Sequence, residues 1–260
     1  MTSYSTDTVC GITGTLPSTL RNWRRAGLIN KPEFADGYSS GQLTRIYTIL
    51  ALTSSGDTLR EVSTQLNDKG NARHSGWECR QEELIDQLNQ PDSLLDGCIR
   101  QMGGDYSGDD FVNSCLKPLN LWLRADIREG AEMRIERFHE AVMLHTRNMT
   151  AAAYRRKSVP LFLEAISVTD PTEIWMEAIR LTGQGFRVEL SAEATGLPAT
   201  SLLRHDHHLM WCGEGICQLM KWNYQEKLRN DKPVRLCGPD QVLLPIPDYV
   251  YPDQSLLPAA

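Results

Sequence analysis

The chain has 260 residues, a formal net charge of −6, 41% hydrophobic residues and 23% charged residues. This composition can build a packed core and excludes an intrinsically disordered chain, and the length predicts one to three domains. No apolar run reaches the roughly 18 residues of a membrane span, and the first ten residues lack the regions of a signal peptide. We therefore expect a cytoplasmic globular protein, whose acidity argues at first against nucleic acid.

Residues 1–70 show the periodicity of short helices. The sequence predicts a first short helix over Thr6–Ile12. Pro17 suits the first turn of a second helix, because a proline there gives up no hydrogen bond, and Gly27 suits its end. This second helix, Pro17–Ala26, contains three arginines and no acidic residue, so it presents a cationic face.

The rest of this segment alternates turns with two further helices. Residues 30–41 contain Pro32, two glycines and an Asp-Gly pair, which predicts turns with a small hairpin. Apolar residues spaced three and four apart predict a third helix through Leu43 and a fourth after Asp57, whose carboxylate is a candidate N-cap. The polar residues 71–74 predict a hinge.

The remainder of the chain divides into two patterns and a tail. Residues 75–156 show helical periods only, which predicts a bundle with helices separated at Gly103-Gly104 and at Gly130. Short apolar runs then alternate with helices, which predicts a parallel sheet with right-handed crossovers. The expected strands are Ser158–Ile166, Phe186–Leu190, His208–Cys212 and Val234–Leu236, with a helix opening at Asp170-Pro171 and another through Leu219, Trp222 and Leu228. Residues 241–260 contain four prolines and predict an extended tail.

A short helix, a tight turn and a cationic helix form the layout of a helix-turn-helix DNA-binding domain. A recognition helix needs long cationic donors for phosphates and base edges, and an acidic side chain there would be repelled. Residues 1–70 hold seven Lys/Arg and six Asp/Glu, a net +1 in a chain of net −6. The acidity therefore belongs to the residues that follow, which need not touch DNA.

Several motifs occur in this segment in a fixed order. They are YSTDTV at 4–9, TLRNW at 19–23, GL at 27–28, KP at 31–32, DGY at 36–38 and GDTLREV at 56–62. Together they resemble the DNA-binding module of the MerR family. The resemblance implies a winged helix-turn-helix regulator, activator or repressor, that binds double-stranded promoter DNA as a homodimer on an inverted repeat. The side chains expected at DNA are Ser18, Thr19, Arg21, Asn22, Trp23, Arg24, Arg25, Lys31 and Tyr38, with Trp23 also serving the core.

The wing departs from the family pattern. Ser39 follows Gly37-Tyr38 where the family has arginine, and Phe34 stands near another usual arginine position. Leu16 also replaces the usual serine N-cap of the recognition helix. These differences favour weaker phosphate contacts from the wing.

The resemblance extends through most of the chain. Residues 76–77 (GW), 81–84 (QEEL) and 209–214 (LMWCGE) are similar to MerR-like regulators of curli and biofilm genes in enteric bacteria, the MlrA type. This implies control of biofilm, curli or virulence-related genes. Those regulators look like relatives of cobalamin-dependent repressors, whose motif Asp-x-His-x-x-Gly holds the cofactor. Here Thr172 and Trp175 replace the His and the Gly, so no cobalamin and no other cofactor is expected.

The expected fold class is therefore mainly α plus α/β, in four segments. Residues 1–70 form a winged helix-turn-helix, 75–156 a helical bundle, 157–240 a degenerate Rossmann-like sheet domain of the cobalamin-binding type, and 241–260 a Pro-rich tail. The two middle segments are expected to serve dimerisation and to bind a protein partner or a small-molecule effector.

Other polar and aromatic groups allow two interpretations. His205, Asp206, His207 and His208 could hold zinc or nickel, or form a polar loop before a strand; we favour the loop and expect no metal. Arg155, Arg156 and Lys157 form either a solvated linker, which we favour, or a contact to DNA or an acidic partner. Trp175, Trp211 and Trp222 belong either to the core, which we favour, or to a ligand pocket. The seven cysteines show no CxxC spacing, which predicts reduced structural thiols.

An enzyme is the rival class. The chain has neither GxGxxG nor GxxxxGK[ST], and the Gly183–Gly185 pair follows a helix instead of a strand. No arrangement of catalytic residues stands out, so no catalytic residue is predicted. The alternative function is a protein-interaction or small-ligand sensor module with a weakened DNA-binding domain, which the altered wing favours.

Overall fold

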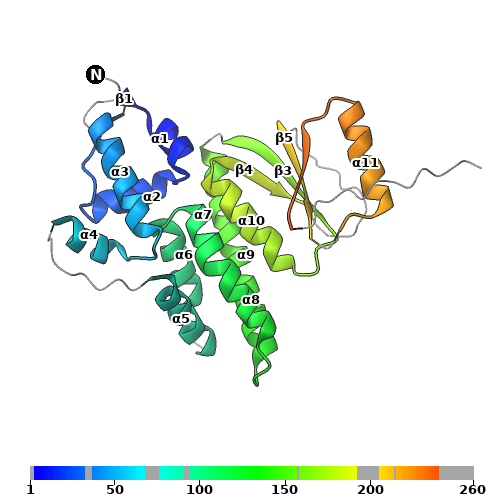
Figure 1. Ribbon diagram of the computed structural model, residues 1–260, viewed down its shortest axis with the longest axis horizontal. Coiled ribbons are helices and arrows are strands. Elements are labelled where there is room, and N and C mark those ends of the chain that lie inside the picture. The colour runs from blue at the N-terminus through cyan, green and yellow to red at the C-terminus, as the bar shows by residue number, and fades with distance from the viewer. Residues whose placement is uncertain are drawn as a thin grey trace, which may run out of the picture.

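The computed structural model describes residues 3–32, 37–67, 76–90, 94–156, 158–191, 205–213 and 215–239. An N-terminal helical domain, a helical bundle and a four-stranded parallel sheet pack beside one another (Figure 1). The expected mainly α plus α/β class is confirmed. Within the described residues, no helix is long and apolar enough to span a membrane. The predicted hinge at 71–74 and the predicted tail at 241–260 lie outside the described residues.

The N-terminal domain contains the predicted helix-turn-helix. Ser5 caps α1 by accepting a hydrogen bond from the Thr8 backbone N–H, and Gly14 ends α1 in the left-handed conformation at φ 64°. Pro17 opens the second helix after Leu16, which makes no side-chain capping bond. The elements are β1 (Ser3–Tyr4), α1 (Thr6–Thr13), α2 (Pro17–Arg25), β2 (Tyr38–Ser39), α3 (Ser40–Thr53) and α4 (Leu59–Asn67).

The predicted hairpin within residues 30–41 is wrong for the part of it that is described. Tyr38–Ser39 pairs antiparallel with Ser3–Tyr4 at the other end of the domain, and residues 33–36 lie outside the described structure. Gly37 permits this pairing, since a Cβ there would lie 2.3 Å from the Tyr4 carbonyl oxygen. The strand is set by a distant partner, which local turn signals do not reveal.

The predicted N-cap of α4 is also wrong by one residue. The Thr58 hydroxyl accepts from the Glu61 backbone N–H, and the Glu61 carboxylate accepts in return from the Thr58 backbone N–H. This reciprocal pair is a capping box. Asp57 instead is fully buried and accepts hydrogen bonds from Ser55 and Gln65.

The bundle follows, as predicted, but one of its expected boundaries is wrong. Gly103 and Gly104 lie inside α6. Glycine is needed at position 103, because the backbone there passes so close to His145 that a Cβ would lie 2.4 Å from its Nε2. Gly130 does precede the longest helix, with φ 76°. The elements are α5 (Gly76–Asn89), α6 (Leu95–Asp105), α7 (Gly108–Asp110), the π-helix η1 (Phe111–Leu116), α8 (Lys117–Ala125) and α9 (Ala131–Arg155).

The C-terminal domain is the predicted parallel sheet, with strand order β4-β3-β5-β6. The helices α10 and α11 cover opposite faces of the sheet (Figure 1), each over its own apolar cluster. Asp170 caps α10 through a hydrogen bond from the Thr172 backbone N–H. The elements are β3 (Val159–Ile166), α10 (Pro171–Gly183), β4 (Phe186–Leu190), β5 (His207–Cys212), α11 (Gln218–Arg229) and β6 (Val234–Cys237).

Three of the cysteines, Cys10, Cys115 and Cys212, are buried, and Cys217 is exposed. None of the seven forms a disulfide. Burial raises the pKa of Cys10 to about 12 and that of Cys115 to about 12, which keeps both thiols protonated and unreactive near neutral pH.

Candidate nucleic-acid interface

The helix α2 divides its side chains between two faces. Ser18, Arg21 and Arg25 are exposed, and Arg24 is partly exposed. Ser18, Arg21 and Arg25 are three, four and seven residues apart, so they share one side of the helix, and Arg24 lies at the edge of that side. No acidic residue lies in α2, and Lys31 is exposed a short distance beyond its end. The helix therefore presents a compact cationic surface to solvent.

Three of the residues expected at DNA belong to the core instead. Thr19 and Trp23 are 0% exposed and Tyr38 is 1% exposed, so their side chains are not available to a groove. Trp23 and Tyr38 pack in the apolar cluster of the N-terminal domain together with Leu20 and Ile46. The family resemblance implied the DNA contact, and for Trp23 it allowed a place in the core as well, because an aromatic side chain fits both.

Asn22 is also engaged elsewhere. Its amide nitrogen donates to the Gly104 carbonyl at 3.2 Å and to the Asp105 carboxylate at 3.3 Å, both on α6. Burial raises the pKa of Asp105, and the hydrogen bond from Asn22 opposes this shift. Asn22 therefore holds the recognition helix on the bundle.

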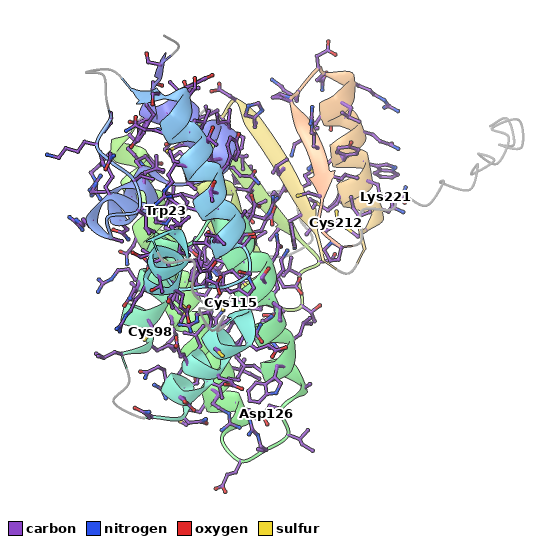
Figure 2. The ribbon with its side chains drawn as sticks, turned by 60° about the vertical axis from the view of Figure 1, so that its left-hand side comes forward. Trp23, Cys98, Cys115, Asp126, Cys212 and Lys221 are labelled. Atoms are coloured by element: carbon purple, nitrogen blue, oxygen red, sulfur yellow. The ribbon has the colours of Figure 1, made fainter. Side chains whose placement is uncertain are left out.

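Aromatic side chains add three hydrogen bonds across the same junction. The Trp23 indole donates to the Asp105 carbonyl at 2.9 Å, at the boundary between the two domains (Figure 2). The Trp77 indole donates to the Ser54 carbonyl at 2.8 Å, and the buried Tyr106 hydroxyl donates to the Gly56 carbonyl at 3.3 Å. Each ring buries apolar surface while its polar atom is satisfied, which makes the junction rigid.

The packing of Leu16 explains why this chain has leucine where the family usually has a serine N-cap. Its side chain is 7% exposed and belongs to the apolar cluster of the bundle, with Phe111, Ile179 and other residues. A serine at this position would cap α2 but would remove this apolar contact between domains. The sequence offered no signal for this role, because Phe111 and Ile179 lie 95 and 163 positions further along the chain.

The end of α9 adds positive charge near the helix-turn-helix. Burial lowers the pKa of the Arg156 guanidinium; the charges of Cys10 and Asp7 oppose this shift, and those of Arg21 and Arg155 add to it. Arg156 is therefore within electrostatic range of both α1 and α2. Lys157, the third member of this basic triplet, lies outside the described residues. Arg155 and Arg156 are both exposed, and the favoured linker interpretation of the whole triplet stays a prediction.

The stretch that would hold cobalamin is occupied by the protein's own contacts. The Thr172 hydroxyl lies 3.0 Å from Nδ1 of His139 on α9. The Asp170 carboxylate accepts from Asn120 at 2.5 Å and from Arg124, which lowers its pKa against the effect of burial. Trp175 faces the guanidinium of Arg147. These residues supply no axial ligand and no open cradle, so cobalamin does not fit the chain through this motif.

The histidine cluster is divided among separate partners. His205 pairs with Glu189 at 2.8 Å, and His208 pairs with the buried Glu164 at 2.7 Å. His207 packs edge-on against Phe186. In the part of the chain that the structure describes, no three potential ligands converge into a metal site. This arrangement agrees with the favoured polar segment leading into β5.

Comparison with known proteins agrees with this division of the chain. Residues 4–69 match the MerR HTH family regulatory protein model, and residues 159–228 match the C-terminal domain model of the transcriptional regulator MlrA. The HTH-type transcriptional regulator MlrA of Salmonella typhimurium (strain LT2) is 23% identical over 220 residues, which cover 80% of this chain and 90% of that protein. The regulator of the same name from Escherichia coli (strain K12) is 24% identical over 220 residues, with the same coverage of both chains. These relatives are transcriptional regulators, and the helix-turn-helix described above lies within the first matched range.

Proposed function

We propose that the chain is a DNA-binding transcriptional regulator of the MerR type and that α2 enters the major groove with Ser18, Arg21, Arg24 and Arg25 toward the DNA. The observation that carries this proposal is the asymmetry of α2. One face is cationic, free of acids and exposed, while the other is fixed by Trp23 and Asn22 to the core and the bundle. A rigid mount of this kind lets arginine side chains hold a defined register in a groove.

The roles of the cations follow from their chemistry. An arginine presents a fork that matches guanine O6 and N7, or two phosphate oxygens. Arg21 and Arg25 lie one turn apart on the exposed face, so one reaches a base edge while the other anchors phosphate. Lys31, a compact point charge beyond the helix, contacts phosphate. Arg155 and Arg156 extend this backbone contact.

We propose further that two copies act together in the cytoplasm. Two identical heads related by a two-fold axis match an inverted repeat. The bundle and the sheet domain join the copies and receive a protein partner or a small effector. The genes controlled are those of biofilm, curli or virulence functions, as the relation to the MlrA regulators suggests, and the protein has no enzymatic activity.

A second candidate function rests on the wing. Ser39 caps α3 in a capping box with Gln42, so the position where the family has arginine serves helix α3. The alternative is therefore a protein-interaction or sensor module whose contact with DNA is weakened.

Genome-wide immunoprecipitation with footprinting distinguishes the two functions. The full chain is compared with Arg21→Ala, Arg24→Ala and the control Arg229→Ala, which removes an exposed arginine of α11. We expect enriched inverted repeats for the wild type and the control, and their loss in both α2 variants. Absence of any enriched DNA from the wild type, together with a stable co-purifying protein, would establish the interaction module instead.

A further inference from the structure

A cavity of about 500 Å³ lies where the bundle meets the sheet domain. Its walls come from η1 and α8 on one side, from α10 on the other, and from the carboxyl ends of β5 and β6 below. This volume lies within the range of small-molecule sites. Crevices outside the carboxyl ends of parallel strands are also where open α/β sheets bind ligands. Thr172 and Trp175, the positions of the missing cobalamin motif, do not line it.

One wall contains a donor without an acceptor. Trp211 lines the cavity and is 7% exposed, and its indole Nε1 has no hydrogen-bond partner among the described residues. A buried N–H that is left unpaired is costly, so native structures nearly always supply a partner. The Nε1 atom is itself buried, so a ligand with an oxygen acceptor beside this ring would supply the partner after a small shift of the surrounding side chains.

The backbone beside the cavity is also unusual. Asn113, on the π-helix η1, lines the cavity, and π-helical segments are frequent at functional sites. On the far side, Gly238 adopts φ 98° and passes so close to β5 that a Cβ would lie 2.4 Å from the Cys212 carbonyl oxygen. These two irregular segments frame the cavity from opposite sides.

The charged residues of the lining are Lys117, Arg180, Glu173 and Glu177, and their pairing indicates where an anionic group would lie. Arg180 is neutralised by Glu177 at 2.5 Å and by Asp109 at 3.2 Å. Lys117 donates only to the neutral Asn113 at 2.9 Å and forms no salt bridge within the described ranges. Glu173 also lines the cavity, from the first turn of α10. The available cation is therefore Lys117, and an anionic group is best placed beside it.

The remaining walls are largely apolar. Met176 is 1% exposed within the core, and the Trp211 ring and Leu121 add further apolar surface. A thioether and an indole make favourable contacts with the ring of a flat aromatic molecule. We propose that this cavity binds a small planar aromatic anion, with its ring between Met176 and Trp211 and its oxygen acceptors toward the Trp211 N–H and Lys117. This proposal does not depend on the DNA-binding role of α2.

The test uses the full chain labelled with ¹⁵N, with 2-naphthoate as the probe and no DNA present. The indole N–H resonance of Trp211 is assigned by its disappearance in Trp211→Phe. We expect that resonance to move in a saturable way with the probe. Trp222→Phe is the matched control, since Trp222 is 60% exposed on the opposite face of the sheet domain.

Two variants and one analogue make the result decisive. We expect Lys117→Gln to raise the Kd for 2-naphthoate at least fivefold and Trp211→Phe to raise it at least threefold, with Trp222→Phe unchanged. The cation 2-naphthylmethylammonium should not bind. Lys117 is partly exposed and lies outside the apolar core, so we expect Lys117→Gln to fold like the wild type. An unmoved Trp211 resonance, an unchanged Kd in Lys117→Gln, or equal binding of the cation would overturn the proposal and would leave the DNA-binding function standing.

Discussion

The indole Nε1 of Trp23 donates to the carbonyl oxygen of Asp105 at 2.9 Å, and this bond joins the recognition helix to the bundle. Trp23 is completely buried, so the side chain in the middle of α2 contacts protein instead of DNA. A displacement of α6 relative to the rest of the molecule would therefore move α2. This relationship links the bundle directly to the helix that carries the exposed arginines.

Replacement of Trp23 by phenylalanine tests this junction. The variant removes the indole N–H, leaves the Asp105 carbonyl without its donor and opens a small void in the core. We expect the free energy of unfolding to fall by roughly 2 kcal/mol, measured by urea denaturation. Trp222→Phe, at an exposed position, should change it by less than about 0.5 kcal/mol. Equal stability of the two variants would show that the hydrogen bond does not stabilise the fold.

Gly37→Ala tests the contact between β1 and β2, and Gly11→Ala is its matched control. A Cβ at Gly37 would lie 2.3 Å from the Tyr4 carbonyl oxygen, whereas Gly11 in α1 has nothing within 4 Å of the corresponding position. Gly37→Ala should therefore destabilise the protein by roughly 1–3 kcal/mol through strain. Gly11→Ala should stabilise it by about 0.5–1 kcal/mol, because alanine costs less entropy in a helix. Thermal unfolding of both variants measures the contrast, and a stable Gly37→Ala would contradict the observed pairing.

The buried imidazole of His145 leads us to predict that the folded protein loses stability in acid. It is 6% exposed, neither ring nitrogen has a hydrogen-bond partner among the described residues, and burial lowers its pKa to about 4, with Arg100 adding to the shift. The folded state therefore keeps the ring neutral, while the unfolded chain binds a proton below about pH 6.5. Stability from this residue is fully present above pH 6.5 and is lost as the pH falls toward 4, by roughly 3 kcal/mol in total.

His145→Leu removes this proton linkage. Because both nitrogens lack partners, an apolar side chain of similar size costs little at neutral pH. We expect the pH dependence of the unfolding free energy between pH 6.5 and 4 to become shallower than in the wild type, measured by urea titrations across that range. His207→Leu is the control, since His207 is exposed, and it should retain the wild-type slope. A wild-type slope in His145→Leu would refute the neutral buried ring.

Salt dependence separates the roles of the α2 cations. A side chain that neutralises a phosphate releases counterions when DNA binds. Its loss therefore makes the negative slope of log K against log salt shallower by about 0.9. We expect Arg25→Ala to reduce the slope by about this amount at any sequence. Arg21→Ala, if it reads a base, should reduce specific binding by about 1–3 kcal/mol with little change of slope. Binding titrations at several salt concentrations measure both, and unchanged affinity and slope in the two variants would exclude α2 from the interface.

Much of the local structure follows from short-range patterns. Phe186–Leu190 and the helix opened by Asp170-Pro171 occur as predicted, because alternation and capping depend on neighbouring residues. The errors arise where a distant segment intervenes. Tyr38–Ser39 pairs with the N-terminal residues, and Gly103 lies within a helix because His145 packs against it.

The sequence by itself determined the order of helices and strands, the helix-turn-helix layout and the acid-free recognition helix, since these depend on periodicity, capping and residue type. Only the tertiary structure decided which face of that helix is buried and which is exposed. The Trp23–Asp105 bond joins residues 82 positions apart, and the Asn22 contacts are as distant. Helical periodicity shows that one side of α2 is buried but not what it is buried against, and that partner fixes Trp23 in the junction and leaves the arginines exposed. The cavity beside Trp211 has the same origin, because its walls come from four segments that meet only in the folded chain.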